Sequence, residues 1–184
     1  FSTIFEENAS DTISTWRASA KGSEEIRTPW ALLRDCGKQY ARIFEKMQRG
    51  RWSKAFMPFV CEMADSYLEA LSYSAAQPIE VELADDLKAP VYLEIKKANG
   101  SPLLWVLLVH TADKDTPLME GNCFATSSES GEPYITSIGN EDLASRIFFS
   151  QTEAPRWLIL IGLNQIALLD RNKWNEKRYL EFDM

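Results

Sequence analysis

The sequence predicts an α/β (α+β) protein with a mixed central sheet of about five strands flanked by helices. Residues 103–110 read LLWVLLVH, and the seven consecutive apolar positions that open this run are typical of a strand covered on both faces. A second apolar pair, 156–161 and 165–170, is separated by the turn signal Gly-Leu-Asn at 162–164. Residues 29–47 instead repeat apolar side chains at spacings of three and four, which indicates an amphipathic helix. Together these patterns predict strands packed between helices.

Composition and charge limit the class of protein. The chain has 184 residues, of which 45% are hydrophobic and 26% charged, and this suits one domain with its own core. We expect an N-terminal arm over residues 1–27 and a single domain over residues 28–184. The net charge of −7 argues against a whole surface that binds nucleic acid, but it leaves a local basic patch open. Because the chain begins with Phe1 rather than Met, we expect it to be part of a longer protein.

Membrane and redox signals are weak. The longest apolar run falls well short of the ~18 residues that indicate a membrane span, so we expect no membrane partner and a cytoplasmic location. The three cysteines form no CxxC pair and indicate neither a zinc site nor a disulfide framework. Cys36 and Cys61 fall on apolar helical faces and are interpreted as small core residues.

Two helices are predicted before the first strand. Thr28 is a favourable N-cap, Pro29 takes the favoured first helical position, and Gly50 follows as a C-cap. A second helix is expected from Ser53 to Leu71, again with an apolar stripe. The junction carries a basic cluster that is either a solvated helix junction or a phosphate contact, namely Lys46, Arg49, Arg51 and Lys54.

The strands are expected in the middle of the chain. Residues 79–83 alternate as IEVEL and predict an edge strand, followed by a turn that holds Asp85 and Asp86. Residues 91–97 alternate in the same way and lead through a turn into the run 103–110. Residues 112–138 are rich in Ser, Thr, Gly and acidic side chains, which predicts a long surface excursion with at most a short strand near its end, at 134–138.

A further helix and a last strand complete the predicted fold. Asn140 is expected to cap a helix whose first turn carries Glu141 and Asp142, favourable charges at the positive end of the helix dipole. The alternating residues 179–182 predict a final strand. The core face of the helix is predicted to consist of Leu143, Ile147 and Phe148.

The resulting order, helix, strand, strand, strand, helix, strand (αβββαβ), is similar to that of the PD-(D/E)xK nuclease superfamily. These enzymes hold Mg²⁺ with clustered carboxylates, because a hard cation prefers oxygen ligands, and their Lys stabilises charge or orients water. Glu94-Ile95-Lys96 has the letters of the family's E-x-K. On this reading Asp86, Glu94 and Lys96 are catalytic, Asp86 (or Asp85) and Glu94 hold the metal, and Glu69 is an accessory carboxylate.

A second alignment with this family matches the positions of the strands instead of the E-x-K motif, and is called here the second register. The family's Asp and E-x-K strands then correspond to 91–97 and 103–110, so Glu94 takes the Asp position, and Leu108 and His110 stand where the metal-binding Glu and the Lys belong. An aliphatic side chain cannot ligate Mg²⁺. The favoured interpretation is therefore a nuclease-like scaffold without its catalytic set, with Glu94 and Lys96 as a solvated pair. His110, the only histidine, is expected to be a hydrogen-bonded residue at the end of its strand.

Three segments carry a resemblance to a known family: PRWLILIGLNQIALLDRNKWNEKRYLEFDM (155–184), LEALSYSAAQP (68–78) and APVYLEIKKANGSPLLWVLLV (89–109). They are similar to the N-terminal region of large fused, type IIG-like restriction-modification proteins whose later part is an N6-adenine DNA methyltransferase. The resemblance covers roughly the last two-thirds of the chain. It implies defence against phage or other foreign DNA, and S-adenosylmethionine as the methyl donor of the parent protein. It also implies a methyltransferase domain beyond residue 184.

For residues 28–184 the resemblance implies an accessory or nuclease-like domain. With Leu108 and His110 at the ligand positions, we expect it to be catalytically degenerate and without a cofactor of its own. Such a domain positions DNA or packs on the methylase domain. One alternative is an active Mg²⁺-dependent endonuclease, and another is an interaction module for other subunits of a phage-defence complex, which would expose a large apolar patch. DNA positioning depends on four basic residues whose charges suit phosphate contacts, namely Arg171, Lys173, Lys177 and Arg178.

Overall fold

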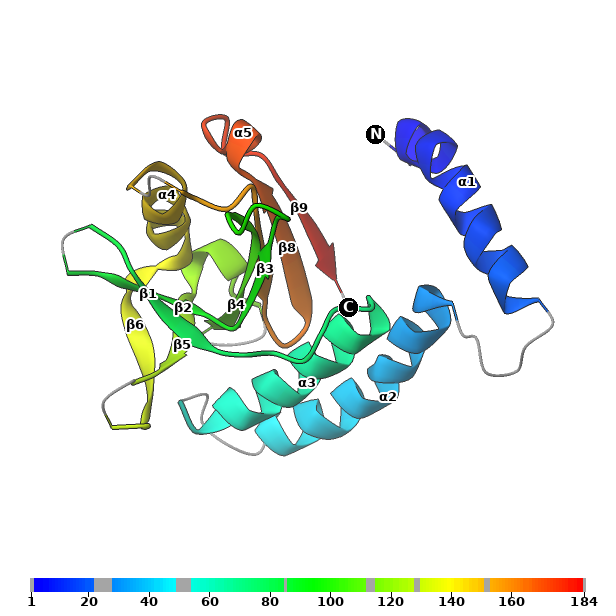
Figure 1. The fold of residues 1–184 in the computed structure, drawn as a ribbon. Coiled ribbons are helices and arrows are strands. Elements are labelled where there is room, and N and C mark those ends of the chain that lie inside the picture. The colour runs from blue at the N-terminus through cyan, green and yellow to red at the C-terminus, as the bar shows by residue number, and fades with distance from the viewer. Residues whose placement is uncertain are drawn as a thin grey trace.

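The computed structural model describes residues 2–21, 28–48, 54–84, 86–111, 115–127, 130–150 and 153–183 (Figure 1). Its helical elements are α1 (Ser2–Ala20), α2 (Pro29–Gln48), η1 (Lys54–Phe56), α3 (Met57–Ala70), η2 (Leu118–Glu120), α4 (Asn140–Ser150) and α5 (Arg171–Trp174). Its strands are β1 (Ile79–Glu82), β2 (Lys88–Val91), β3 (Leu93–Lys96), β4 (Pro102–His110), β5 (Asn122–Thr126), β6 (Pro133–Gly139), β7 (Trp157–Ile161), β8 (Gln165–Asp170) and β9 (Tyr179–Asp183). The protein is therefore a mixed α and β structure, as the sequence predicts.

Most of the strands form one mixed sheet around β4. Seven strands take the order β6-β5-β4-β7-β8-β9, with β3 also paired to β4, while β1 and β2 form a separate antiparallel pair. β4 is antiparallel to β3 and β5 and parallel to β7. The described sheet has more strands than the five expected. The αβββαβ order is not confirmed, because six strands rather than three lie between α3 and α4.

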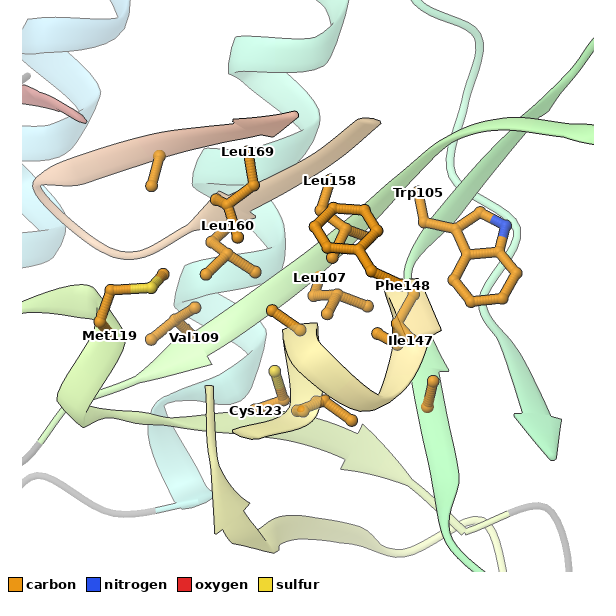
Figure 2. Close-up of a cluster of buried hydrophobic side chains, with 14 of the residues drawn as sticks. Trp105, Leu107, Val109, Met119, Cys123, Ile147, Phe148, Leu158, Leu160 and Leu169 are labelled. Atoms are coloured by element: carbon orange, nitrogen blue, oxygen red, sulfur yellow. The ribbon is translucent and has the colours of Figure 1, made fainter. Parts of the chain in front are cut away.

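Helices cover both faces of β4, which explains why its sequence is apolar throughout. Leu104, Val106 and Leu108 belong to a core shared with α2 and α3, called here the α2–α3 core. The alternate residues Trp105, Leu107 and Val109 belong to a second core built with α4, η2 and Trp174 of α5, called here the α4 core (Figure 2). None of the six is more than 6% exposed. The prediction of a central strand covered on both faces is confirmed.

The N-terminal helices follow their local signals. The Ala31 N–H donates to Thr28 Oγ1 at 3.3 Å, which confirms Thr28 as the N-cap of α2. The predicted C-cap Gly50 and the predicted helix start Ser53 lie outside the described residues. The second helix forms as η1 followed by α3. None of the described helices combines the length and the apolar character needed to cross a membrane.

The predicted strand 91–97 is divided in the structure. Residues up to Val91 pair with β1, residues from Leu93 pair with β4, and the chain bends between them at Tyr92. The Tyr92 N–H donates to the Val106 carbonyl at 2.8 Å, and its hydroxyl donates to Asp65 Oδ1 of α3 at 2.7 Å. The prediction of one strand was wrong because the alternation of apolar and polar residues continues through the bend.

The prediction for 112–138 was right about the strand near its end, which is β6, but wrong about the rest as a surface excursion. The segment also forms η2 and β5, and it buries Leu118, Cys123 and Phe124 at 1%, 0% and 4% exposure. Its polar composition reflects half-buried strands with one face toward solvent. These strands extend the sheet beyond β4.

Asn140 begins α4, but its side chain bonds to the preceding segment rather than capping the helix. Its Nδ2 donates to the Leu118 carbonyl at 2.6 Å, and its Oδ1 accepts from Cys123 Sγ at 3.1 Å. The helix otherwise matches the prediction, because its three expected core residues are each 0% exposed: Leu143, Ile147 and Phe148.

The C-terminal strands confirm the predicted apolar pair and the final alternating strand. β7 and β8 are antiparallel around the predicted turn, and β8 pairs with β9. The short helix α5 was not expected. Its N-cap is Asp170, whose Oδ1 accepts from the Asn172 N–H at 2.9 Å.

Candidate functional site

Glu94 is held by two donors beside the α4 core. It stands on β3 directly opposite Trp105 of β4. Its Oε1 accepts from Trp105 Nε1 at 3.0 Å, and its Oε2 lies 3.0 Å from Lys96 Nζ. The Glu94 side chain is 16% exposed, whereas that of Lys96 is 57% exposed. Glu94 is thus a mostly buried carboxylate with a donor at each oxygen, and Lys96 is the solvated partner.

Asp86 lies in the turn between β1 and β2, with a φ of 57°. Beside this turn Glu82 pairs with Lys88, and β2 runs from there toward the bend at Tyr92, after which β3 begins. Asp86 and Glu94 therefore lie beyond opposite ends of β2. The alternative acidic partner, Asp85, lies outside the described residues.

Glu69 lies on the other side of the sheet from Glu94. It is an exposed residue of α3, a helix of the α2–α3 core, whereas the partner of Glu94, Trp105, belongs to the α4 core. The expected accessory carboxylate is therefore separated from Glu94 by the sheet. Across the described part of the chain, no three His, Cys, Asp or Glu side chains are grouped so as to hold a metal ion.

Of the two β4 positions of the second register, Leu108 is buried and His110, at the end of the strand, is half-buried. Leu108 is 2% exposed in the α2–α3 core. The ring of His110 packs edge-on against Phe124 with centroids 5.2 Å apart, and its buried Nε2 has no hydrogen-bond partner in the described structure. The ring takes part in a backbone hydrogen bond, as expected, but not through Nε2. Burial lowers the pKa of His110, which favours the neutral ring.

The predicted DNA-binding residues lie on α5 and the turn after it, and three of them face carboxylates. Lys173 Nζ lies 3.9 Å from Glu176, and Arg178 Nε lies 3.0 Å from the same side chain. Lys177 Nζ lies 2.9 Å from Glu141 of α4. These pairs are exposed, so each contributes little to stability, but they offset the positive charge of this surface.

Arg171 is the fourth predicted basic residue, and it begins α5. Its N–H donates to the Arg156 carbonyl at 3.0 Å. Arg156 binds Asp170 through two hydrogen bonds, of 2.6 and 3.0 Å, and this guanidinium lowers the pKa of Asp170. Arg156, just before β7, and Asp170, at the end of β8, are therefore joined by a salt bridge at the start of α5.

The basic cluster predicted between the first two helices is described only in part. The side chain of Lys46 and the residues Arg49 and Arg51 lie outside the described part of the chain. Lys54 is exposed on η1. The choice between a solvated junction and a phosphate contact stays a prediction.

Sequence reasoning missed a cleft between α3, the β1–β2 pair and β5. The cleft has a volume of about 290 Å³, and Met57, Glu80, Tyr92 and Phe124 are among its lining residues. Beside it, Tyr134 Oη donates to Glu80 Oε1 at 2.9 Å, and burial with this hydrogen bond raises the pKa of Tyr134 to about 12. The five residues named come from five separate segments, so no local sequence pattern indicates the cleft.

The cysteines have no disulfide role in the structure. Cys36 is buried, as predicted, and Cys61 is only partly buried, while Cys123 is fully buried. Burial raises the pKa of all three thiols, which disfavours the thiolate form.

The described residues thus include a carboxylate paired with an indole N–H and a lysine, a basic segment paired with carboxylates, and a cleft beside α3. Comparison with known proteins adds no relative: no protein-family model, curated protein or solved structure matches the chain.

Proposed function

We propose that this chain contains an accessory, non-catalytic, nuclease-like domain of a restriction-modification DNA adenine methylase. The domain acts by packing, and methyl transfer from S-adenosylmethionine belongs to the methyltransferase domain expected beyond residue 184. The observation that carries the non-catalytic role is the environment of Glu94, whose oxygens accept from Trp105 Nε1 and face Lys96 Nζ at 3.0 Å each.

This environment suits a structural carboxylate better than a metal ligand. Mg²⁺ is bound through oxygens at about 2.1 Å in near-octahedral geometry, so a ligand carboxylate must turn an oxygen toward the ion. A metal ion at Oε1 would leave the N–H of the almost fully buried Trp105 without its acceptor, and a metal ion at Oε2 would have to displace the Lys96 ammonium. Leu108, in the core, offers no oxygen at the position of the second register.

The paired basic residues support packing over DNA positioning. Binding to DNA releases counterions in proportion to the phosphates that Lys and Arg neutralise. Lys173, Lys177 and Arg178 would first have to leave Glu176 or Glu141. An anisotropy titration of duplex DNA across a salt series tests this, with weak binding expected. Salt-dependent binding that is lost when all four predicted basic residues are changed to Gln would favour DNA positioning instead.

The endonuclease alternative predicts a different outcome in a cleavage assay. The 184-residue chain is incubated with supercoiled plasmid and Mg²⁺ or Mn²⁺, and we expect the plasmid to stay intact. Cleavage that disappears in Glu94→Gln or Lys96→Met would overturn the non-catalytic role. Lys97→Met is the matched control, because Lys97 is an exposed neighbour outside the E-x-K.

One specific observation favours the interaction-module alternative. Among the exposed large apolar side chains of the described residues, three lie on the single strand β9: Tyr179, Leu180 and Phe182, at 38%, 44% and 47% exposure. Leu180 and Phe182 pair with Leu168 and Ile166 on the α2–α3 side of the sheet, whereas Tyr179 pairs with Leu169 on the other side. The apolar pair Leu180 and Phe182 on an edge strand is the kind of surface that supports a contact with another protein.

A further inference from the structure

The turn between β3 and β4 carries the one Asn-Gly pair in the sequence, Asn99-Gly100. The Gly100 N–H donates to the Lys97 carbonyl at 2.9 Å, and the Lys97 N–H donates to the Ser101 carbonyl at 2.8 Å, which closes the turn. Gly100 has a φ of 86°, a left-handed conformation that favours glycine. Residues 96–100 are all exposed, so water has access to this turn.

The Asn99 side chain accepts hydrogen bonds from two donors of Ser101. Its Oδ1 accepts from the Ser101 hydroxyl at 2.8 Å and from the Ser101 N–H at 3.2 Å. Asparagine often makes side-chain contacts of this kind with its own backbone in tight turns. Both donors face one carbonyl oxygen, and they draw electron density away from its carbon, Cγ. Donors so placed stabilise the negative charge that develops on the oxygen when a nucleophile attacks the carbon.

The nucleophile nearest to this carbon along the chain is the backbone nitrogen of Gly100. Attack of Gly100 N on Asn99 Cγ closes a small ring, because only the Asn99 carbonyl carbon, Cα and Cβ lie between the two atoms. A side chain on the residue that supplies the nitrogen hinders such an attack. Gly100 has none, and nothing lies within 4 Å of the position that its Cβ would take. The approach to Cγ is therefore open.

We propose that Asn99 is a site of spontaneous deamidation, with Gly100 N as the nucleophile and Ser101 as the residue that stabilises the reacting oxygen. Hydroxide removes the proton of Gly100 N once its hydrogen bond to the Lys97 carbonyl opens. The electron pair of this nitrogen forms the bond to Asn99 Cγ, and Oδ1 takes the negative charge beside the two Ser101 donors. The bond from Cγ to Nδ2 then breaks, and Nδ2 takes a proton from water and leaves as ammonia.

Water opens the resulting succinimide ring at either of its carbonyls and returns a proton to Gly100 N. Opening at Cγ gives aspartate, and opening at the backbone carbonyl gives isoaspartate, in which the main chain runs through the former side chain. Either product is one unit more negative than the unmodified chain, whose net charge is −7. The new carboxylate stands on the exposed turn that follows Lys96 and Lys97. The inference does not depend on the proposed accessory role, because it would stand even if the domain cleaved DNA.

The test is incubation of the folded 184-residue chain at several pH values between 7 and 9, followed by digestion with trypsin and mass spectrometry. We expect deamidation of Asn99 in the peptide 98–114, at a rate that increases with the hydroxide concentration. A sample digested without incubation corrects for deamidation during digestion. Asn175 is the internal control and should stay an amide, because it is also exposed but precedes Glu176 rather than a glycine.

Two variants test the role of Ser101. Ser101→Ala removes the hydroxyl donor and should slow the deamidation of Asn99 by about two- to tenfold, the range that one hydrogen bond supports. Ser101→Thr keeps a hydroxyl and should react nearly as fast as the wild type. In urea the difference should vanish, because an unfolded chain does not hold Ser101 against Asn99. An Asn99 that stays an amide in the folded chain but deamidates in urea would overturn the proposal, as would a folded Ser101→Ala variant that reacts as fast as the wild type.

Discussion

Trp105 and Glu94 face each other across β4 and β3, and the indole Nε1–H donates to the carboxylate Oε1 at 3.0 Å. Trp105 is 1% exposed, so its polar N–H has little access to water. Glu94, the glutamate of the E-x-K pattern, therefore accepts a hydrogen bond from a buried indole N–H in the central sheet. Its energetic role can be measured independently of any activity.

Replacing Glu94 with Leu should destabilise the fold, because the buried indole N–H loses its acceptor. We expect the free energy of unfolding to fall by about 1–3 kcal/mol. Glu94→Gln retains an amide oxygen as acceptor and should cost less. Urea denaturation followed by far-ultraviolet circular dichroism gives both values. Equal losses in the two variants would mean that the hydrogen bond to Trp105 contributes little.

The protein should lose stability as the pH falls below about 6.5, the ordinary pKa of histidine. Burial lowers the pKa of His110 in the folded state, so below pH 6.5 the unfolded chain binds a proton that the folded chain resists. The loss in the free energy of unfolding therefore increases as the pH falls from 6.5 toward the lower pKa that His110 has in the folded protein. Denaturation at several pH values between 5 and 7.5 measures it.

His110→Phe should flatten this pH dependence, because no titrating ring remains beside Phe124. Asp170 does not interfere, since its lowered pKa affects stability only near and below its usual value of 3.8. An unchanged slope in His110→Phe would assign the pH dependence to another group.

Two glycines should respond in opposite ways to alanine. A Cβ at Gly121 would lie 2.6 Å from the His110 carbonyl oxygen and 3.0 Å from Val109 Cγ1, so the backbone between η2 and β5 must shift. We expect Gly121→Ala to cost about 1–3 kcal/mol, as overpacked sites do. Gly37 lies in α2 with nothing within 4 Å of its Cβ position. Gly37→Ala should stabilise by up to about 1 kcal/mol through helix propensity. Urea midpoints compare the two, and a stabilised Gly121→Ala would contradict the close approach.

Both removal of the Asn140 amide and its replacement by a carboxylate should destabilise the protein. It is 1% exposed, and its Nδ2 donates to the Leu118 carbonyl at 2.6 Å. Asn140→Ala leaves that carbonyl unpaired, at a cost of about 1–3 kcal/mol. Asn140→Asp should cost more, because a carboxylate would face the carbonyl in a buried position. Thermal unfolding measures both against Asn175→Asp at an exposed site. An aspartate variant as stable as the wild type would refute this role.

The sequence predicted those elements whose pattern lies within a short stretch of neighbouring residues. The apolar run of β4 indicated a strand between two layers, and the pair β7 and β8 followed from two apolar segments around a short turn. Thr28 and Pro29 located the start of α2, because capping depends on neighbouring residues alone. These predictions succeeded since each pattern is complete within a few residues.

Elements and site features that depend on distant partners were not predictable in the same way. Tyr92 bends the chain toward Asp65 of α3, and nothing in its own strand announces that hydrogen bond. Cys123 is buried because α4 and Asn140 cover it, although its segment reads as a polar loop. The partner of Glu94 is a residue on the next strand, so letters resembling E-x-K gave no information about which donors hold the carboxylate.

The parallel pairing of β4 with β7 has a consequence for how the protein is synthesised. β4 acquires this neighbour only when residues 157–161 have left the ribosome, long after its own residues 102–110. Until then one edge of a strongly apolar strand is bare, and such edges promote aggregation of nascent chains. A product that terminates between α4 and β7 would therefore accumulate as insoluble material, whereas release after β8 would allow the hydrophobic centre to close.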